Sequence, residues 1–379
     1  MKVMVGVTHL LGAGHLSRAL TLARAFAAQG HDTVLVSGGR PVPHFDRTGV
    51  DVVQLPPLHS DGTNFTHLLT DDGAAVTEAA MQARRNMLLE TLTQVQPDIL
   101  ITELYPFGRR VLRHEFLALL QTARSLPRRP LVLASIRDIL APPSKPERAT
   151  AADDVIDRYY DGVLVHSDER STPLDQSWPV SDRLRPKLHY TGYVAPPAAG
   201  PHPDRAGQGE VIVAAGAGSV GDALFETAAM AARQPSAMTW RLLVGGAHPE
   251  PRIARLLDLS GGNAVVEPVR PDFRQLLYHA DCAVTMCGYN TALDILQSGC
   301  PAVLVPFDDG GEVEQTLRAA SLTRLDGITA VKTSDLSPET LIQAVRTTKN
   351  HRRPAGLVLH FDGAQRSVEI AVTLQRGRR

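Results

Sequence analysis

The sequence predicts an α/β protein made of two domains, each of which begins with a strand, a glycine-containing loop and a helix. The chain has 379 residues, which is more than one hydrophobic core usually organises. Apolar strands are expected over 2–7 and 211–215, and each leads through such a loop into a helix. We expect an N-terminal domain over 1–195, a Pro- and Gly-rich linker over 196–209 and a second domain over 210–345. A helical segment over 346–379 is then expected to pack back on the first domain.

Composition and charge narrow the class of protein. The 39 basic and 40 acidic residues nearly cancel, so no basic surface for nucleic acid is expected. The three cysteines, Cys282, Cys287 and Cys300, form no CxxC pair, which favours a reducing, cytoplasmic location. Residues 2–7 are typical of a strand rather than a signal peptide, and no apolar run approaches the roughly 20 residues of a membrane span. Peripheral association with the inner face of a membrane remains open.

The first domain opens with a βαβ unit. A strand over 2–7 ends in the loop THLLGAGH, a helix follows, and a second strand covers 33–37. The loop contains GxG, but Ser17 stands where a dinucleotide fingerprint has its third glycine, and no acidic residue follows the second strand. NAD binding is therefore not favoured. His15 belongs to the first turn of the helix. It can have a structural role, in capping or packing, or a functional one, as a base or an anion contact.

Charged side chains are expected at the ends of three later strands of this domain. Strands over 98–102, 131–135 and 163–166 lead to Glu103, Arg137 and His166. Each alone can be a structural ion pair, but the carboxyl ends of parallel strands line the crevice of an open α/β sheet. A polar surface loop over 63–72 and a helix over 78–95 precede these strands.

The second domain repeats the strand, loop and helix start, and its main feature is a glycine turn. Strands are expected over 240–244, 264–268, 284–286 and 302–305, with helices from 223 and over 273–280. Gly288 breaks the third of these strands, and Asn290 or Thr291 can cap the helix that ends at Gly299. Because free N–H groups and the helix dipole both favour an anion there, we expect a nucleotide diphosphate at this turn. One or two helices should follow over 336–374.

Several segments together resemble a known family. GAGHLSRALTLARAFAAQGH, GAGSVGD, ADCAVTMCGYNTALDILQSGCPAVLVPF and GEVEQ resemble the MurG-like, family 28 glycosyltransferases. Nearly the whole chain also resembles a group of bacterial predicted glycosyltransferases. The resemblance implies a GT-B fold, with two Rossmann-like domains facing across a cleft. It also implies a metal-independent, inverting transfer of a hexosyl or N-acetylhexosaminyl group from a UDP-sugar to an unknown hydroxyl acceptor, with no cofactor. The acid pairs Asp71–Asp72 and Asp308–Asp309 form no clear metal constellation.

The resemblance also assigns roles in donor binding. Asp294 matches the ribose-binding acid, although Thr291 and Asp294 are also spaced like a capping box. The first residue of the Glu314–Gln315 sugar-binding pair is acidic here rather than an amide, and the pair can instead be a solvated helix start. Arg270 either borders the base or is an exposed loop residue. The remaining donor-site residues are the second phosphate loop, Gly218 and Ser219, and the diphosphate turn, Gly288, Tyr289, Asn290 and Thr291.

Catalysis and acceptor binding are expected in the first domain. We expect His15 or Glu103 to deprotonate the acceptor hydroxyl, a choice that only geometry can make. Gly14, Tyr105, Arg137 and His166 are expected on the acceptor side. Two alternatives remain: a nucleotide-sugar hydrolase or epimerase on the same fold, and a nucleotide-sugar-binding protein without turnover.

Overall fold

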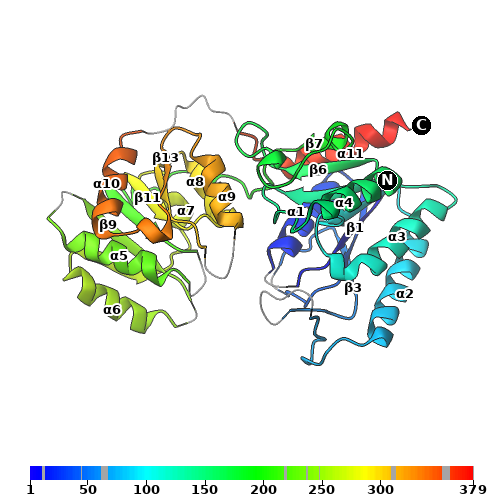
Figure 1. Cartoon of the computed structure of the whole chain (residues 1–379), viewed down its shortest axis with the longest axis horizontal. Coiled ribbons are helices and arrows are strands. Elements are labelled where there is room, and N and C mark those ends of the chain that lie inside the picture. Colours follow the sequence, from blue (N-terminus) through cyan, green and yellow to red (C-terminus); the bar gives the residue numbers. More distant parts are fainter. Residues whose placement is uncertain are drawn as a thin grey trace. The chain divides into compact units, whose positions relative to one another are not determined.

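The protein divides into two compact units (Figure 1). The computed structural model describes residues 1–10, 13–43, 45–60, 67–216, 220–235, 238–246, 248–308, 313–351 and 359–378. Unit 1 contains Met1–Glu169, Pro173–Val194 and Asp362–Arg379, and unit 2 contains Arg170–Thr172 and Ala195–Phe361. The chain thus passes from unit 1 to unit 2 at residues 194 and 195. The segment 346–379 is divided, because its last helix belongs to unit 1 and the preceding residues to unit 2.

Unit 1 is built on a parallel sheet in the order β3-β2-β1-β4-β5-β6-β7. The chain runs outward from β1 in one direction and restarts at β4 beside it, so the topological switch point lies between these two strands. The strands are β1 (Lys2–Val7), β2 (Asp32–Ser37), β3 (Asp51–Gln54), β4 (Ile99–Glu103), β5 (Leu131–Arg137), β6 (Gly162–His166) and β7 (Leu188–Tyr190).

Helices cover both faces of this sheet, as the alternation of buried side chains requires. Val3, Val5 and Val7 of β1 pack with α1 and α11, whereas Met4 packs with the cluster that includes α2, α3 and α4. The C-terminal helix therefore completes the core of unit 1. The helices are α1 (Gly14–Ala28), α2 (Glu78–Val95), α3 (Arg113–Ser125), α4 (Pro146–Tyr159) and α11 (Gly363–Gly377), with short 3₁₀ turns η1 (Arg110–Leu112), η2 (Leu174–Gln176) and η3 (Arg185–Lys187).

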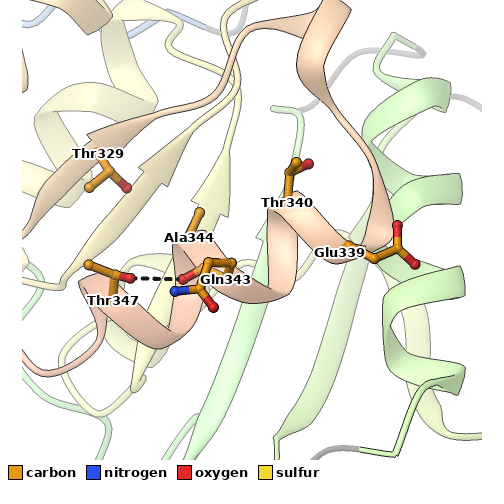
Figure 2. A pocket seen from close by; sticks show the side chains of 6 residues that line it. All are labelled: Thr329, Glu339, Thr340, Gln343, Ala344 and Thr347. Atoms are coloured by element: carbon orange, nitrogen blue, oxygen red, sulfur yellow. Dashed lines mark hydrogen bonds between the residues drawn. The ribbon is translucent and has the colours of Figure 1, made fainter.

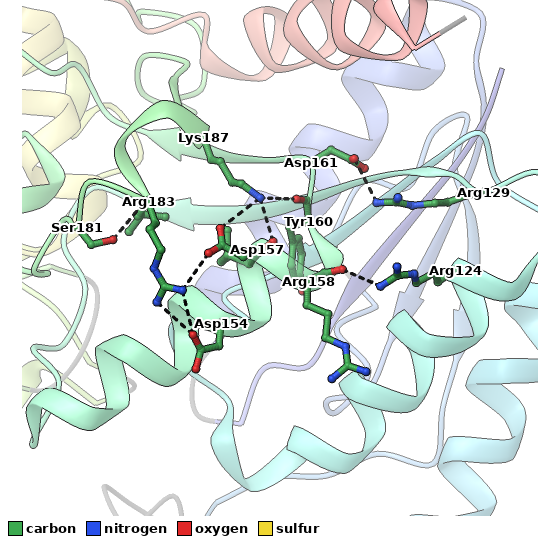
Figure 3. A network of polar contacts seen from close by, with 12 residues as sticks. Arg124, Arg129, Asp154, Asp157, Arg158, Tyr160, Asp161, Ser181, Arg183 and Lys187 are labelled. Carbon is green, nitrogen blue, oxygen red and sulfur yellow. Dashed lines mark hydrogen bonds and ion pairs between the residues drawn. The ribbon is translucent and has the colours of Figure 1, made fainter.

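A polar network fixes the C-terminal end of α4 to the turn that leads into β7 (Figure 3). Arg183 contacts Asp154 and Asp157 at 3.1 Å, and Lys187 Nζ donates to the carbonyl oxygen of Tyr160 at 3.1 Å. Arg183 and Asp154 are exposed, so their ion pair contributes little stability alone. The network belongs to the scaffold.

Unit 2 contains a second parallel sheet, in the order β10-β9-β8-β11-β12-β13. Its switch point lies between β8 and β11. One face packs against α5, α6 and α10, whose apolar residues join those of β8 and β9 in a single core. The elements are β8 (Glu210–Ala214), α5 (Asp222–Arg233), β9 (Thr239–Val244), α6 (Glu250–Ser260), β10 (Ala264–Pro268), α7 (Phe273–Leu276), β11 (Cys282–Thr285), α8 (Tyr289–Ser298), β12 (Ala302–Leu304), α9 (Glu314–Leu322), β13 (Ile328–Ala330), η5 (Thr333–Asp335) and α10 (Pro338–Thr348).

Two local predictions in unit 2 are wrong. Helix α8 begins at Tyr289 with Gly288 as its N-cap, so neither Asn290 nor Thr291 caps it. The helix expected over 273–280 is shorter and ends at Leu276, followed by turns. The glycine N-cap has an extended conformation, φ −64° and ψ 152°, and has no side chain with which to cap α8.

Candidate active site

In each unit, some of the predicted site residues lie at the carboxyl ends of the two strands at the switch point. His15 follows β1 and Glu103 ends β4 in unit 1. In unit 2, the Gly288 turn follows β11. Ligands of open α/β sheets bind at this position, because the loops diverge there and leave a crevice at the carboxyl ends of the strands.

Glu103 is the centre of a buried cluster in unit 1. Its carboxylate Oε1 lies 2.8 Å from His15 Nδ1 and forms an ion pair with Arg18. Its Oε2 accepts a 2.9 Å hydrogen bond from the Ser135 hydroxyl. The Glu103 side chain is 2% exposed, whereas that of His15 is 14% exposed. The carboxylate is thus held by three side chains, and the imidazole is the group of the pair that a substrate can reach.

The charges of this cluster fix the tautomer of His15. Burial opposes ionisation of Glu103, but the charge of Arg18 and the hydrogen bond from His15 lower its pKa below the usual value. An ionised carboxylate only accepts hydrogen bonds, so His15 donates its Nδ1–H to Glu103 and keeps a lone pair on Nε2. Burial lowers the pKa of His15 to about 4, against the opposing effect of Glu103. His15 is therefore a neutral imidazole with Nε2 able to accept a proton.

A second imidazole extends the cluster into the core. Because Ser135 donates its hydroxyl hydrogen to Glu103, its oxygen accepts from Nε2–H of His166 at 2.9 Å. His166 Nδ1 lies 2.9 Å from Thr191 Oγ1, whose hydroxyl also lies 2.7 Å from the carbonyl oxygen of Gly192. His166 is fully buried, and burial lowers its pKa to about 3, which keeps it neutral. Ser135 and His166 thus orient the carboxylate of Glu103 from the core side, away from His15.

In unit 2, the N-terminus of α8 is open. A Cβ added to Gly288 would meet no atom within 4 Å, and the φ of this residue suits any amino acid. Neither packing nor backbone strain therefore accounts for a glycine here. Gly288, Tyr289 and Thr291 are half-buried, and Asn290 is exposed. The N-cap glycine has no capping side chain and has open space beside its Cα, an arrangement that suits an anion at the N-terminus of a helix.

Side chains from α9 hold this turn. The carbonyl oxygen of the Gln315 side chain accepts hydrogen bonds from the backbone N–H of Cys287 at 2.9 Å and of Phe307 at 3.2 Å. The buried Arg318 donates to the carbonyl oxygen of Cys287 at 2.9 Å and to Glu314 at 2.7 Å. Its guanidinium carbon lies 5.7 Å from the centre of the Tyr289 ring.

Comparison with known proteins gives a family for unit 2. Residues 212–355 match the glycosyltransferase family 28 C-terminal domain. The matched residues lie within unit 2, which is thus similar to this family's C-terminal domain. This match confirms the predicted family.

Two relatives carry the name UDP-N-acetylglucosamine–N-acetylmuramyl-(pentapeptide) pyrophosphoryl-undecaprenol N-acetylglucosamine transferase. The one from Brucella anthropi is 30% identical over 138 residues, which cover 35% of this chain and 37% of the relative. The one from Desulforamulus reducens is 29% identical over 85 residues, or 22% of this chain and 23% of the relative. These alignments span well under two thirds of either relative.

A solved structure extends the likeness to the whole chain. The crystal structure of Acinetobacter baumannii MurG superposes with a TM-score of 0.63 at 16% identity, covering 99% of this chain and 95% of that one. At this identity the likeness concerns the fold. It confirms the predicted GT-B class of two parallel-sheet α/β domains.

The residues predicted for donor binding in the family 28 domain lie in different environments. Asp294 lies on α8 with its Oδ1 2.8 Å from Arg274 Nε, and burial raises its pKa. Because Thr291 is inside the helix, the capping-box alternative for Asp294 is wrong. Arg270 forms a two-pronged ion pair with Asp272 at 2.7 and 2.8 Å. Gly218 and Ser219 lie outside the described residues.

Two of the four residues predicted on the acceptor side are buried. Tyr105 is 2% exposed and stacks on Phe116 with ring centres 4.7 Å apart, and His166 is fully buried. Their side chains therefore lie in the core of unit 1, which does not fit the predicted contact with an acceptor. Gly14 is exposed at the first position of α1, and Arg137 is half-buried at the end of β5.

Sequence reasoning missed the arginines of both sites. Arg18 follows His15 by three residues and Arg318 follows Gln315 by three, so each pair shares a helix face. This spacing was the available signal, because a charged residue on an apolar helix face needs a buried partner.

One hollow in unit 2 is lined by residues other than those predicted to bind the donor. It has a volume of about 480 Å³ beside α10 and β13 and is lined by Thr329, Glu339, Thr340, Gln343, Ala344 and Thr347 (Figure 2). None of the predicted donor-site residues lines it. Within the described ranges, no group of three or more His, Cys, Asp or Glu side chains could hold a metal, and no helix is long and apolar enough to cross a membrane.

Proposed function

We propose that this protein transfers a sugar from a nucleotide-sugar donor, a UDP-sugar, to a hydroxyl group of an acceptor. The observation that carries the proposal is the open, glycine-capped N-terminus of α8 at the switch point of a family 28 domain. The names of the relatives make UDP-N-acetylglucosamine the first donor to try.

His15 is the general base of the proposed reaction. Its Nε2 takes the proton of the acceptor hydroxyl while the hydroxyl oxygen forms a bond to the anomeric carbon. The bond from the anomeric carbon to the diphosphate oxygen breaks, and its electron pair leaves with the nucleotide diphosphate. Attack opposite to the leaving group inverts the anomeric configuration. We assign the base to His15 rather than to Glu103 because Glu103 is buried and its carboxylate already accepts three hydrogen bonds.

Glu103 acts on His15 instead. When Nε2 gains the proton, His15 becomes a cation 2.8 Å from the carboxylate, and the ion pair stabilises the charge that develops in the transition state. Arg18 and Ser135 keep the carboxylate in place. This arrangement resembles a catalytic pair in which the acid orients and stabilises the base.

The family 28 domain supplies the leaving-group site. The backbone N–H groups at the N-terminus of α8, beginning at Gly288, and the dipole of this helix stabilise the negative charge on the departing diphosphate. This site performs the proposed reaction without a metal ion, so activity should persist in excess EDTA. Asp294 has a second carboxylate oxygen beyond the one that contacts Arg274, which can accept hydrogen bonds from the ribose hydroxyls.

Acceptor identity is tested with labelled donor. UDP-N-acetylglucosamine carrying a radioactive sugar is incubated with the protein, with and without bacterial lipid extract or a panel of hydroxylated small molecules. We expect label in a new product that requires an acceptor and is lost in a His15→Gln variant. Fast, stoichiometric release of free sugar without acceptor would show a hydrolase. Vesicles of anionic lipid, sedimented with the protein, test the proposed peripheral contact with a membrane.

A further inference from the structure

The turn that precedes α8 is held by two side chains from another helix. Gln315 accepts the N–H of Cys287, and Arg318 donates to the C=O of the same residue, both at 2.9 Å. We call these two side chains and Cys287 the turn clamp. Gln315 was predicted to contact the donor sugar, but its side-chain oxygen is engaged by Cys287 and Phe307.

The contact between Arg318 and Cys287 sets the direction in which the backbone N–H of Gly288 points at the anion site. The C=O of Cys287 and the N–H of Gly288 belong to one planar trans peptide, so they point in opposite directions. A guanidinium bound to that oxygen therefore lies behind the peptide and fixes the N–H of Gly288 toward the other side. A hydrogen bond to the carbonyl also polarises the peptide and strengthens its N–H as a donor.

The buried charge of Arg318 has a local partner, but the partner alone does not explain it. Arg318 is 1% exposed and contacts Glu314, which is 17% exposed, one helical turn earlier. Burying a charge is costly, and a buried ion pair is often no more stabilising than an apolar pair of similar volume. The contact with Cys287 places a positive charge one peptide away from the N-cap of α8.

We propose that Gln315 and Arg318 are positioning residues for the donor diphosphate. Arg318 orients and polarises the peptide whose N–H meets the phosphate oxygens, and its charge adds to the helix dipole. Glu314 is the counter-ion that keeps Arg318 in place. The inference rests on the proposed function and makes Arg318 a determinant of affinity for the phosphates rather than for the nucleoside.

Calorimetric titration of purified variants tests the inference. UDP, GDP and dTDP are first titrated into the wild type. The diphosphate that binds best is then compared with its own nucleoside, which lacks phosphates. Arg318→Gln should lower the affinity for the nucleoside diphosphate by roughly tenfold or more, because a hydrogen bond from a charged group contributes about this much. The affinity for the nucleoside should change by less than about twofold. Arg318→Lys keeps the charge and should be intermediate. Arg324→Gln removes an exposed charge just beyond α9 and should match the wild type.

A double variant distinguishes positioning of the turn by Arg318 from simple neutralisation of the charge on Glu314. If Arg318 only neutralises Glu314, then Glu314→Gln with Arg318→Gln should restore diphosphate affinity. We expect the double variant to stay weak. Equal diphosphate binding by the wild type and Arg318→Gln, or equal loss for diphosphate and nucleoside, would overturn the inference and leave the proposed function intact. A wild type that binds no nucleotide would overturn both.

Discussion

Replacing Glu103 by glutamine removes the charge on which the unit 1 cluster depends. The carboxylate is 2% exposed and pairs with Arg18, which is 6% exposed. Leaving such a buried cation without its carboxylate costs about 3–5 kcal/mol. Total stabilities of protein domains are about 5–15 kcal/mol, so unit 1 should remain folded at 25 °C but unfold at markedly lower urea.

The same substitution should impair catalysis beyond its effect on stability. A neutral amide can still hydrogen-bond His15, but it cannot stabilise the imidazolium that forms during proton transfer. We expect kcat to fall by about 10⁴, as when the acid that orients a catalytic histidine is replaced by its amide, with little change in nucleotide affinity. Urea unfolding measures the stability, and initial rates of sugar transfer below the unfolding temperature measure the activity.

The matched control for Glu103→Gln is Glu369→Gln, an exposed glutamate on α11 of the same unit. It should change the free energy of unfolding by less than about 0.5 kcal/mol and leave kcat at the wild-type value. A Glu103→Gln protein with wild-type stability and wild-type kcat would refute the assignment of Glu103 as the partner of His15.

Two further substitutions test the buried imidazole and the ribose site. Burial lowers the folded pKa of His166 from 6.5 to about 3, so the unfolded chain binds more protons and stability falls as pH drops below 6.5. His166→Asn should make the free energy of unfolding less pH-dependent by about 1.4 kcal/mol per pH unit between pH 6 and 4, measured by urea unfolding; an unchanged slope would contradict the buried, neutral histidine. Asp294→Asn should weaken binding of a nucleoside by about tenfold while sparing inorganic diphosphate, as read by calorimetry; equal binding to both proteins would remove Asp294 from the ribose site.

Much of the fold follows from periodicity in the sequence. The strand over 2–7, the helix over 78–95 and the strand over 264–268 have the predicted bounds, because apolar period and turn residues are local signals. The short, half-exposed β3 was not predicted, since its four residues pair only with β2 at the sheet edge. The start of α8 was predicted too late in the sequence. The prediction relied on a capping side chain at Asn290 or Thr291, whereas the N-cap is Gly288, which has no side chain.

The candidate site was predicted less completely than the fold. His15 and Glu103 could be assigned to the same side of one sheet, because both follow strands at the carboxyl edge. Their 2.8 Å contact, and the choice of His15 as base, depend on Arg18 and Ser135, which are distant in sequence from Glu103. Burial of Tyr105 and His166 is likewise a property of the folded core that strand ends do not reveal.

The most direct test of the central claim is a thermal-shift titration of the purified chain with UDP, GDP and dTDP, each beside its own nucleoside. A ligand at 100 times its Kd stabilises the native state by about 2.7 kcal/mol. For a domain of this size, we expect a rise in Tm of several degrees for one nucleoside diphosphate and a clearly smaller rise for its nucleoside at the same concentration. No rise with any of the three diphosphates would contradict a nucleotide-sugar site at the N-terminus of α8.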